Sequence, residues 1–172
     1  MLIVEKGIIT STARLHKFPV PLSSTAEQTY LTGLLYGWGP RDDSAMVRMY
    51  YPDPIAKVQS SKSPEEAAAD LEKVVKLMTY TNICAAAEAI AFARFLKVDT
   101  NQFYDLVVNA AGGSKIFRTL GDIMIKGIPK GPAPEGTLSI DRVIEELSEI
   151  IQKGRDLYTP LNLATEALNV FL

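Results

Sequence analysis

The stretch NAAGGSKIF at residues 109–117 places a hydroxyl and an amine directly after a pair of glycines. A phosphate-binding P-loop needs glycines spread over a longer loop, a lysine followed by serine or threonine, and a preceding strand. Here Ser114 precedes Lys115, and the residues before them have a helical pattern. A serine–lysine nucleophile needs more than one adjacent pair. Helix capping explains the stretch locally, with a glycine ending one helix and Ser114 starting the next.

A substrate-facing loop is the second interpretation of Gly112, Gly113 and Ser114, because N–H groups at the start of a helix can hold a carboxylate. Asn82 is a further candidate. It is a polar amide within an apolar helical stripe, so it must find a partner either across a helix interface or at a ligand cleft. These four residues are the predicted substrate-binding residues, and the residues alone predict no catalytic or cofactor-binding residue.

His16 and Cys84 are the single representatives of their residue types. A zinc site of cysteine and histidine therefore has too few ligands, and a disulfide within the chain is excluded. His16 stands near a predicted helix end, where the helix dipole explains it better than catalysis does. Cys84 falls in an alanine-rich apolar stripe, where a small buried thiol is the ordinary role.

The charged candidates have equally plain interpretations. Lys73 and Lys76 are expected to be solvated positions on a helix. Glu145–Glu146 fall in the first turns of a predicted helix, where negative charge is stabilising, so no general-acid role is predicted. Asp42 and Asp43 precede an apolar segment, a position that favours capping over metal binding.

The composition excludes several classes of function. The formal net charge is −2, and lysine and arginine are scattered, which removes the general electrostatic case for nucleic-acid binding. We find neither a signal peptide nor a membrane span. A strand–GxGxxG–helix segment is absent too, so no dinucleotide-binding domain is predicted. We expect a soluble protein of the cytoplasm that binds neither nucleic acid nor a membrane.

One long helix dominates the predicted elements. Ser63 is a good N-cap, Pro64 suits the first turn, and Glu66 completes a capping box. Apolar residues then recur at three- and four-residue steps to about Leu96. Because so long a helix exceeds the usual globular length, we expect it to span a whole domain.

The remaining periodic segments are shorter and also helical. We expect a helix to about His16 and another from Ser23 to about Tyr36. Further helices are expected over residues 101–111, 115–127, 141–158 and 160–172, with proline- and glycine-rich loops between several of them. No segment reads as a convincing strand. The predicted fold is all-α.

An internal repeat indicates how the chain is organised. ARLHKFPVPLSSTAEQTYL and GRDLYTPLNLATEALNVFL superpose with a constant offset, so that a helix–proline break–helix unit occurs at both ends of the chain. The first copy lacks a counterpart of the long helix. We therefore predict the tail of one helical domain at 1–52, a linker at 53–62 and a complete helical domain at 63–172.

The segment from Thr81 to Phe117, with N-I-x-A-x-A-E-A followed by A-G-G-S, resembles the C-terminal helical domain of the β-hydroxyacid dehydrogenases. That family contains 3-hydroxyisobutyrate and threonate dehydrogenases and is related to 6-phosphogluconate dehydrogenase. The ending D-D-S-A-M-V of the first repeat is similar to the same domain. The order of the two parts resembles the tandem dehydrogenase modules of large fungal and plant fusion proteins.

The resemblance implies NAD-linked oxidation of small 3-hydroxy acids, with a catalytic lysine early on the long helix in a K-x-x-N-N pattern. Position 72 is Glu72 in this sequence, and the paired asparagines correspond to Val75 and Lys76. Lys73 is one residue away, about 100° around the helix. The family's later lysine–aspartate pair, which faces the cofactor, corresponds to Glu145–Glu146 and, in the first copy, to Val4–Glu5; neither copy keeps the lysine.

Three hypotheses follow for the function. The first is a helical substrate and dimerisation domain that is inactive alone, binds no cofactor by itself, and associates with itself or with a dinucleotide-binding partner. The second is a part of a larger NAD-dependent oxidoreductase that holds a small hydroxy acid through Asn82, Gly112, Gly113 and Ser114. The third is a truncated gene product with an uncovered apolar face.

Overall fold

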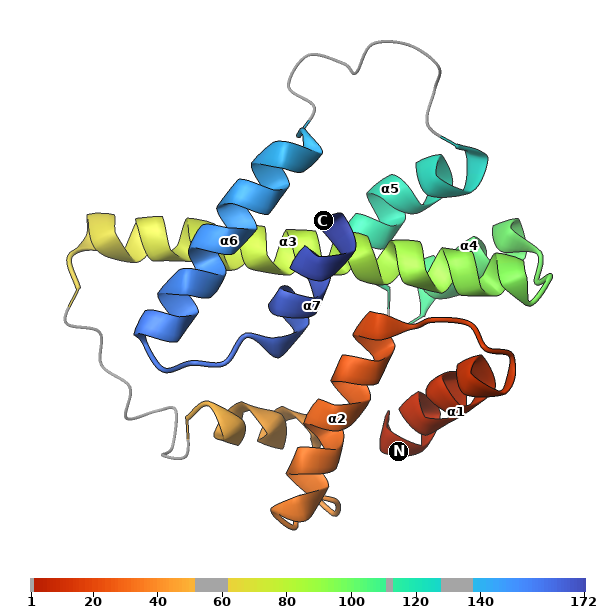
Figure 1. The fold of residues 1–172 in the computed structure, drawn as a ribbon, viewed down its shortest axis with the longest axis horizontal. Helices are drawn as coiled ribbons and strands as arrows, with labels where there is room; N and C mark the ends of the chain where they lie inside the picture. Colours follow the sequence, from red (N-terminus) through yellow and green to blue (C-terminus); the bar gives the residue numbers. More distant parts are fainter. Residues whose placement is uncertain (1, 52–61, 111–112, 128–137) are drawn as a thin grey trace.

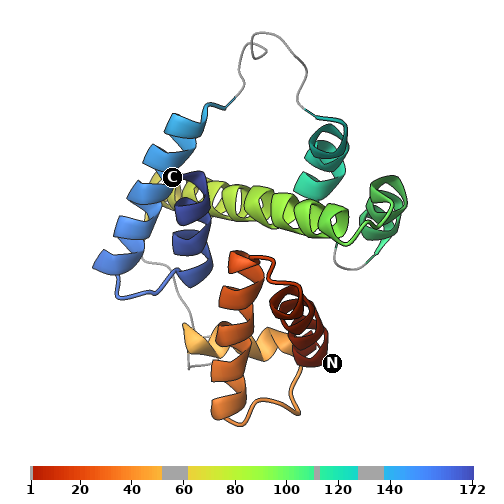
Figure 2. The same cartoon turned by 45° about the vertical axis from the view of Figure 1, so that its right-hand side comes forward.

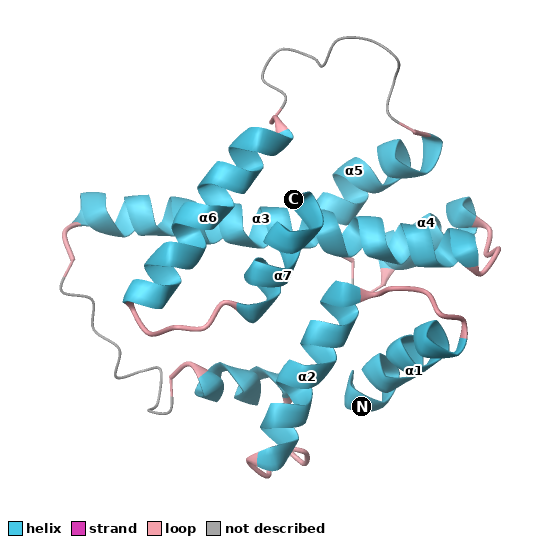
Figure 3. Ribbon diagram, in the orientation of Figure 1, coloured by secondary structure: helices cyan, strands magenta, loops and turns pink. Residues whose placement is uncertain are grey.

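The structure is a computed structural model that describes residues 2–51, 62–110, 113–127 and 138–172. Its regular elements are α1 (Leu2–Leu15), α2 (Pro21–Leu35), the 3-10 helix η1 (Asp43–Met49), α3 (Pro64–Phe95), α4 (Thr100–Asn109), α5 (Lys115–Lys126), α6 (Ile140–Asp156) and α7 (Asn162–Phe171). Within these ranges every element is a helix, which confirms the all-α prediction (Figures 1 and 3).

The long helix α3 begins and ends as local chemistry dictates. The Glu66 backbone N–H donates to Ser63 Oγ at 3.2 Å, and the Ser63 N–H donates to the Glu66 carboxylate at 2.9 Å. This pair is the predicted capping box. At the other end Lys97 takes a left-handed conformation with φ of 59°, and the Val98 N–H donates back to the Ala93 carbonyl at 3.0 Å. The prediction of one domain-length helix is confirmed.

Two apolar clusters lie along α3. The first joins the middle of α3 to α2, α6 and α7, and its buried residues are Leu22, Tyr80, Cys84, Val143, Leu147, Ile151, Ala164 and Ala167. The second joins the later turns of α3 to α4 and α5 through the buried residues Ala86, Ile90 and Phe117. In Figures 1 and 2 α3 is the central rod, with α6 crossing its first half and α4 and α5 flanking its second half. α3 therefore contacts α2, α4, α5, α6 and α7, whereas α1 and η1 pack against α2.

The predicted internal repeat is visible in the backbone. Lys17 after α1 and Tyr158 after α6 both take left-handed conformations, with φ of 56° and 53°. The Phe18 N–H donates to the Ala13 carbonyl at 2.9 Å, and the corresponding bond in the second copy measures 2.8 Å. The turns after α1 and α6 thus have the same geometry, which the turn after α3 at Lys97 also has. The domain limits at 1–52, 53–62 and 63–172 stay a prediction, and residues 53–61 fall outside the described ranges.

The second helix of each copy does not begin where the sequence predicted. α2 begins at Pro21 rather than at Ser23, and α7 begins at Asn162 rather than at Pro160. The cap of α2 is a distant carboxylate: the Leu22 and Ser23 N–H groups donate to Glu88 of α3 at 2.8 and 3.0 Å. The Ser23 hydroxyl donates to the same carboxylate at 2.6 Å. A tertiary contact therefore caps α2, whose own N-cap residue Val20 makes no side-chain cap bond.

Aromatic contacts complete the attachment of the first repeat to α3. The Phe18 ring lies 5.2 Å from Phe92 and 4.7 Å from Phe95, measured between centroids. His16 meets Phe95 edge-on at 6.1 Å. His16 follows the last residue of α1, as expected for a residue at a helix C-terminus. Among the described helices none is both long and apolar enough to cross a membrane.

Replacing Glu88 with alanine removes the acceptor of three hydrogen bonds at the start of α2. Because bonds to a charged, partly buried acceptor are the stronger class, we expect the free energy of unfolding to fall by about 1–3 kcal/mol in urea denaturation. Glu149→Ala is the matched control, since Glu149 is exposed on α6 and bonds to no other described residue. The control should change stability by less than about 0.5 kcal/mol. Equal losses in the two variants would contradict the capping role.

Candidate functional site

The candidate loop between α4 and α5 differs in one respect from the predicted glycine stop. α4 ends at Asn109 with Ala110 as its C-cap, so no glycine caps this helix. Gly112 lies outside the described residues. The Gly113 N–H donates to the Ala110 carbonyl at 3.0 Å, and its φ is not positive. The Gly113–Ala110 bond is a backbone turn that joins the two described ends of the loop.

Gly113 is required by close packing. A Cβ atom built there would lie 2.6 Å from the Val107 carbonyl oxygen and 3.1 Å from that of Val108. Real side chains do not approach backbone oxygens so closely, so only glycine fits without a backbone shift. The glycine is thus explained without any ligand.

Ser114 behaves as the predicted N-cap. Its Oγ accepts a hydrogen bond from the Phe117 N–H at 3.0 Å, and the Phe117 ring fills the second apolar cluster. Two further bonds bracket the loop: the Tyr104 hydroxyl donates to the Arg118 carbonyl at 2.8 Å, and Arg118 donates to the Val108 carbonyl at 3.1 Å. These two bonds join α4 directly to α5 beside the loop.

Asn82 lies on α3 and satisfies part of its amide locally. Its Nδ2 donates to the Met78 carbonyl one turn earlier, at 2.8 Å. The structure gives no bond between Asn82 and Ser114 or Gly113, so these candidates are not joined into one polar site. The two interpretations of Asn82, a helix interface and a ligand cleft, both stay predictions.

Glu146 is the centre of a polar cluster that sequence reasoning missed. From α6 it accepts a hydrogen bond from the Tyr80 hydroxyl of α3, and its other oxygen lies 3.1 Å from Lys76 and 3.0 Å from Arg142. The Glu146 side chain is only 15% exposed. Lys76 also pairs with Glu72 at 2.9 Å. The cluster fixes the crossing of α3 and α6.

The cluster shifts the pKa values of its members. The hydrogen bond from Tyr80, followed by those from Arg142 and Lys76, lowers the pKa of Glu146 to about 2 against the opposing effect of desolvation. Desolvation and the neighbouring carboxylate raise the pKa of Tyr80 to about 12. Glu146 is therefore ionised, and Tyr80 protonated, across the whole physiological range.

This cluster corrects two predictions. Lys76 is not a freely solvated lysine, because it bridges Glu72 and Glu146. Glu146 stabilises the contact between α3 and α6, in addition to the start of α6. The sequence did contain a signal: Tyr80 occurs among apolar residues of the long helix, and a buried phenol needs a hydrogen-bond partner.

The structural roles expected for Cys84 and Asp42 are confirmed. Cys84 is buried, its thiol donates to the Ala167 carbonyl at 3.7 Å, and burial raises its pKa to about 11, so it is a poor nucleophile. Asp42 accepts a hydrogen bond from the Ser44 N–H at 3.0 Å and caps η1. In the described part of the chain no group of three or more potential ligands could hold a metal ion.

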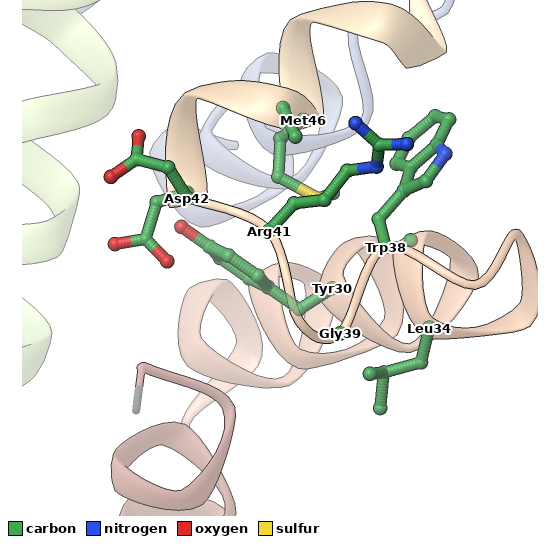
Figure 4. Close-up of a pocket in the computed structure, with 10 residues that line it drawn as sticks. Tyr30, Leu34, Trp38, Gly39, Arg41, Asp42 and Met46 are labelled. Atoms are coloured by element: carbon green, nitrogen blue, oxygen red, sulfur yellow. The ribbon is translucent and has the colours of Figure 1, made fainter.

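A small cavity lies between α2 and η1 (Figure 4). Its volume is about 40 Å³, far below that of typical ligand pockets. Met46 packs so closely over Gly33 that a Cβ there would lie 2.6 Å from its sulfur. In Figure 4 the Arg41 side chain extends towards Trp38. The cavity is a packing gap beneath η1 and not a substrate site.

Replacing Gly113 with alanine should destabilise the protein, because the new Cβ would overlap the Val107 carbonyl. We expect a loss of about 1–3 kcal/mol, the usual cost of overpacking, in urea denaturation. The matched control is Gly7→Ala within α1, where a Cβ meets nothing within 4 Å. That change should stabilise by up to about 1 kcal/mol through helix propensity. A neutral Gly113→Ala would remove the packing explanation.

The Glu146 cluster should make stability depend on pH. The folded pKa of about 2 lies below the ordinary value of 4.5, so the contribution is complete above pH 4.5 and is lost as pH falls towards 2. The raised pKa of Tyr80 gives a contribution that is complete below pH 10 and is lost as pH rises towards 12. Urea unfolding across pH should show the advantage of wild type over Glu146→Gln shrinking below pH 4.5. A stability difference between the two proteins that does not change with pH would contradict the stabilising role of the Glu146 cluster.

No family model matches the sequence. The chain is 30% identical over 105 residues to L-threonate dehydrogenase from Pectobacterium atrosepticum, a match that covers 60% of this chain and 32% of that protein. It is 31% identical over 96 residues to L-threonate dehydrogenase from Escherichia coli K12, covering 56% and 30%. The solved structure of 3-hydroxyisobutyrate dehydrogenase from Salmonella typhimurium aligns with a TM-score of 0.52 and 29% identity, over 59% of this chain and 34% of that one.

This chain thus spans about a third of the length of the curated relatives that it matches. Over the length that these matches cover, the chain is similar to L-threonate dehydrogenases and to a 3-hydroxyisobutyrate dehydrogenase.

Proposed function

We propose that this chain is a helical substrate and dimerisation domain of β-hydroxyacid dehydrogenase type that does not transfer hydride by itself. One observation carries the proposal. Glu146 corresponds by resemblance to the aspartate of the family's lysine–aspartate pair, yet its carboxylate is occupied by Tyr80, Lys76 and Arg142. A group bonded in this way stabilises the α3–α6 contact, and three of the roughly four lone-pair sites of its carboxylate are already used.

The position of the family's catalytic lysine supports the same conclusion. Glu72 stands there, and it forms an ion pair with Lys76 at 2.9 Å. Lys76 itself stands where the family has the second of two asparagines. Both positions now take part in contacts within and between helices. A carboxylate at position 72 cannot take the role of a protonated amine towards an oxyanion.

NAD, which the family implies, does not fit the residues of this chain. Glu145 and Glu146 occupy the positions of the pair that faces the cofactor, and two carboxylates repel a diphosphate. Glu146, with its pKa of about 2, keeps its charge at neutral pH. We therefore assign no cofactor to this chain alone. A separate dinucleotide-binding domain would have to supply NAD in a complete enzyme.

The second candidate is a part of a larger oxidoreductase that acts on a small 3-hydroxy acid such as threonate or 3-hydroxyisobutyrate. The identities to L-threonate dehydrogenases support it. Asn82, Gly112, Gly113 and Ser114 would then line the substrate side of a cleft. Their local bonds give no independent support for this, because Gly113 and Ser114 are explained by packing and capping.

We place the protein in the cytoplasm as part of the same proposal. Its one cysteine is a buried free thiol, which suits a reducing compartment. The association proposed is with a second copy or with a dinucleotide-binding partner.

The purified chain, incubated with NAD and either threonate or 3-hydroxyisobutyrate, should form no NADH above the rate without protein. An absorbance assay at saturating NAD measures this directly. Turnover by the chain alone would overturn the proposal. Repeating the assay with an added dinucleotide-binding domain, alongside thermal-shift measurements with the same acids, tests the second candidate. Stabilisation by one acid, together with turnover that appears only in the mixture, would favour it.

A further inference from the structure

A groove of about 230 Å³ opens where the last turns of α6 lie against the first half of α3. Val74 and Leu77 of α3 form one wall, and Ile150 of α6 and Leu157, its C-cap, form the other. Figure 1 shows α6 crossing this half of α3. The walls of the groove therefore belong to the two longest helices and not to a loop.

The floor of the groove is closely packed. Gly154 is buried, and a Cβ built on it would lie 2.8 Å from a methyl carbon of Leu161. Leu161 and Leu77 in turn pack against the first apolar cluster. Because close-packed interiors resist rearrangement, a floor that rests on the core keeps the groove open without a ligand.

The volume of the groove limits the size of a ligand. A cavity of about 150 Å³ accepts benzene, whereas pockets for drug-sized ligands measure about 300–1,000 Å³. The groove lies between these limits, at about 230 Å³. In proportion to benzene, it holds an apolar body of about eight or nine carbon atoms. Such a ligand is far smaller than a dinucleotide.

The mouth of the groove exposes apolar side chains to water. Val74 is 48% exposed and Leu157 is 61% exposed. Exposed apolar side chains around a concave apolar floor, bordered by charged residues, are typical of a ligand-binding groove. An alkyl chain that covers these walls leaves water together with them, which is favourable. The walls therefore favour an apolar ligand body.

The charged side chains that border the groove gather around Asp70. Its carboxylate forms an ion pair with Lys62, and Lys73 and Lys153 lie close enough to act on its charge. The hydrogen bond from Lys62 is the main reason that the pKa of Asp70 lies below its ordinary value. Asp70 is thus ionised at neutral pH, and Lys62 balances its charge.

The charges of Lys73 and Lys153 are not balanced in this way. Neither lysine forms an ion pair with a residue in the part of the chain that the structure describes. Both are exposed, and they come from different helices, α3 and α6. A carboxylate placed between them accepts hydrogen bonds from two ammonium groups, whereas a cation there is repelled. The border therefore favours an anionic head group.

The groove is separate from the positions that the resemblance connects with catalysis. At about 100° per residue, Glu72 points about 150° around α3 from the middle of the groove residues on that helix. Glu146 lies about two turns before Lys153 on α6. A ligand in the groove is therefore additional to a hydroxy-acid substrate bound at those positions.

We propose that the groove between α3 and α6 binds a small amphipathic monoanion, with its apolar body on Val74 and Leu157 and its head group between Lys73 and Lys153. A medium-chain carboxylate such as octanoate has this chemistry. The volume, the apolar walls and the two unpaired lysines all favour this occupant. The proposal goes beyond the function proposed above and does not depend on it, because neither hydride transfer nor dimerisation enters it.

Isothermal titration calorimetry of the full chain with octanoate tests the position of the apolar body. Val74→Trp fills the groove and should raise the dissociation constant of octanoate by more than about tenfold. Val75→Trp is the matched control: Val75 is the next residue, is similarly exposed and lies outside the groove, so its change should leave the constant unaltered. Circular dichroism checks that both variants fold.

The same titration with 1-octanol, which has no charge, tests the head group. Lys73→Gln combined with Lys153→Gln should weaken octanoate binding at least about threefold, since exposed ion pairs contribute modestly, and should leave 1-octanol binding unchanged. Lys115→Gln is the control, because Lys115 is exposed on α5, away from the groove. Equal weakening by the control, or no weakening in the double variant, would overturn the assigned head-group position.

Two other results would overturn the proposal as a whole. One is a wild type that binds no octanoate, or in which Val74→Trp and Val75→Trp weaken binding equally. The other is a wild type that binds no octanoate but self-associates, with dissociation by Val74→Trp in sedimentation equilibrium; a second copy would then be the occupant. Either result would leave the assay for hydride transfer, and the function proposed from it, unaffected.

Discussion

The fold depends on α3 being held on several sides at once, and two carboxylates hold it there. Glu88 projects from α3 to the start of α2, and Glu146 projects from α6 to Tyr80 of α3. Each carboxylate accepts several hydrogen bonds, because a partly buried charge is tolerated only when it is fully bonded. The apolar clusters supply most of the favourable burial. The carboxylates decide which helix crosses which part of α3.

Sequence reasoning predicted what depends on neighbours along the chain. The capping box of Ser63, the length of α3 and the helix–turn–helix repeat all follow from local spacing. The start of α2 was missed because its cap, Glu88, lies far away in sequence. Lys76 was assigned to solvent, and Glu146 to the start of its own helix, for the same reason. A lysine on a helix has the same local pattern whether or not a carboxylate from another helix lies beside it.

The candidate loop is a second case in which the sequence pattern did not reveal the role of its residues. Gly113 and Ser114 belong to the segment that carries the family resemblance. For that reason a substrate-binding role was predicted for them. In the structure both residues have complete structural explanations: Gly113 avoids the Val107 carbonyl, and Ser114 caps α5. No sequence pattern distinguishes a glycine kept for packing from one kept for a ligand, since only the position of a distant carbonyl decides between them.

Glu146 is a structural group at a position that the resemblance connects with catalysis. A double-mutant cycle on the free energy of unfolding, with Tyr80→Phe, Glu146→Gln and the combined variant, tests this most directly. Both substitutions conserve shape: Tyr80→Phe removes the donor hydroxyl, and Glu146→Gln removes the charge of the acceptor. The account predicts a coupling free energy of about 1 kcal/mol or more between the two sites. Additive effects, with no coupling, would contradict it.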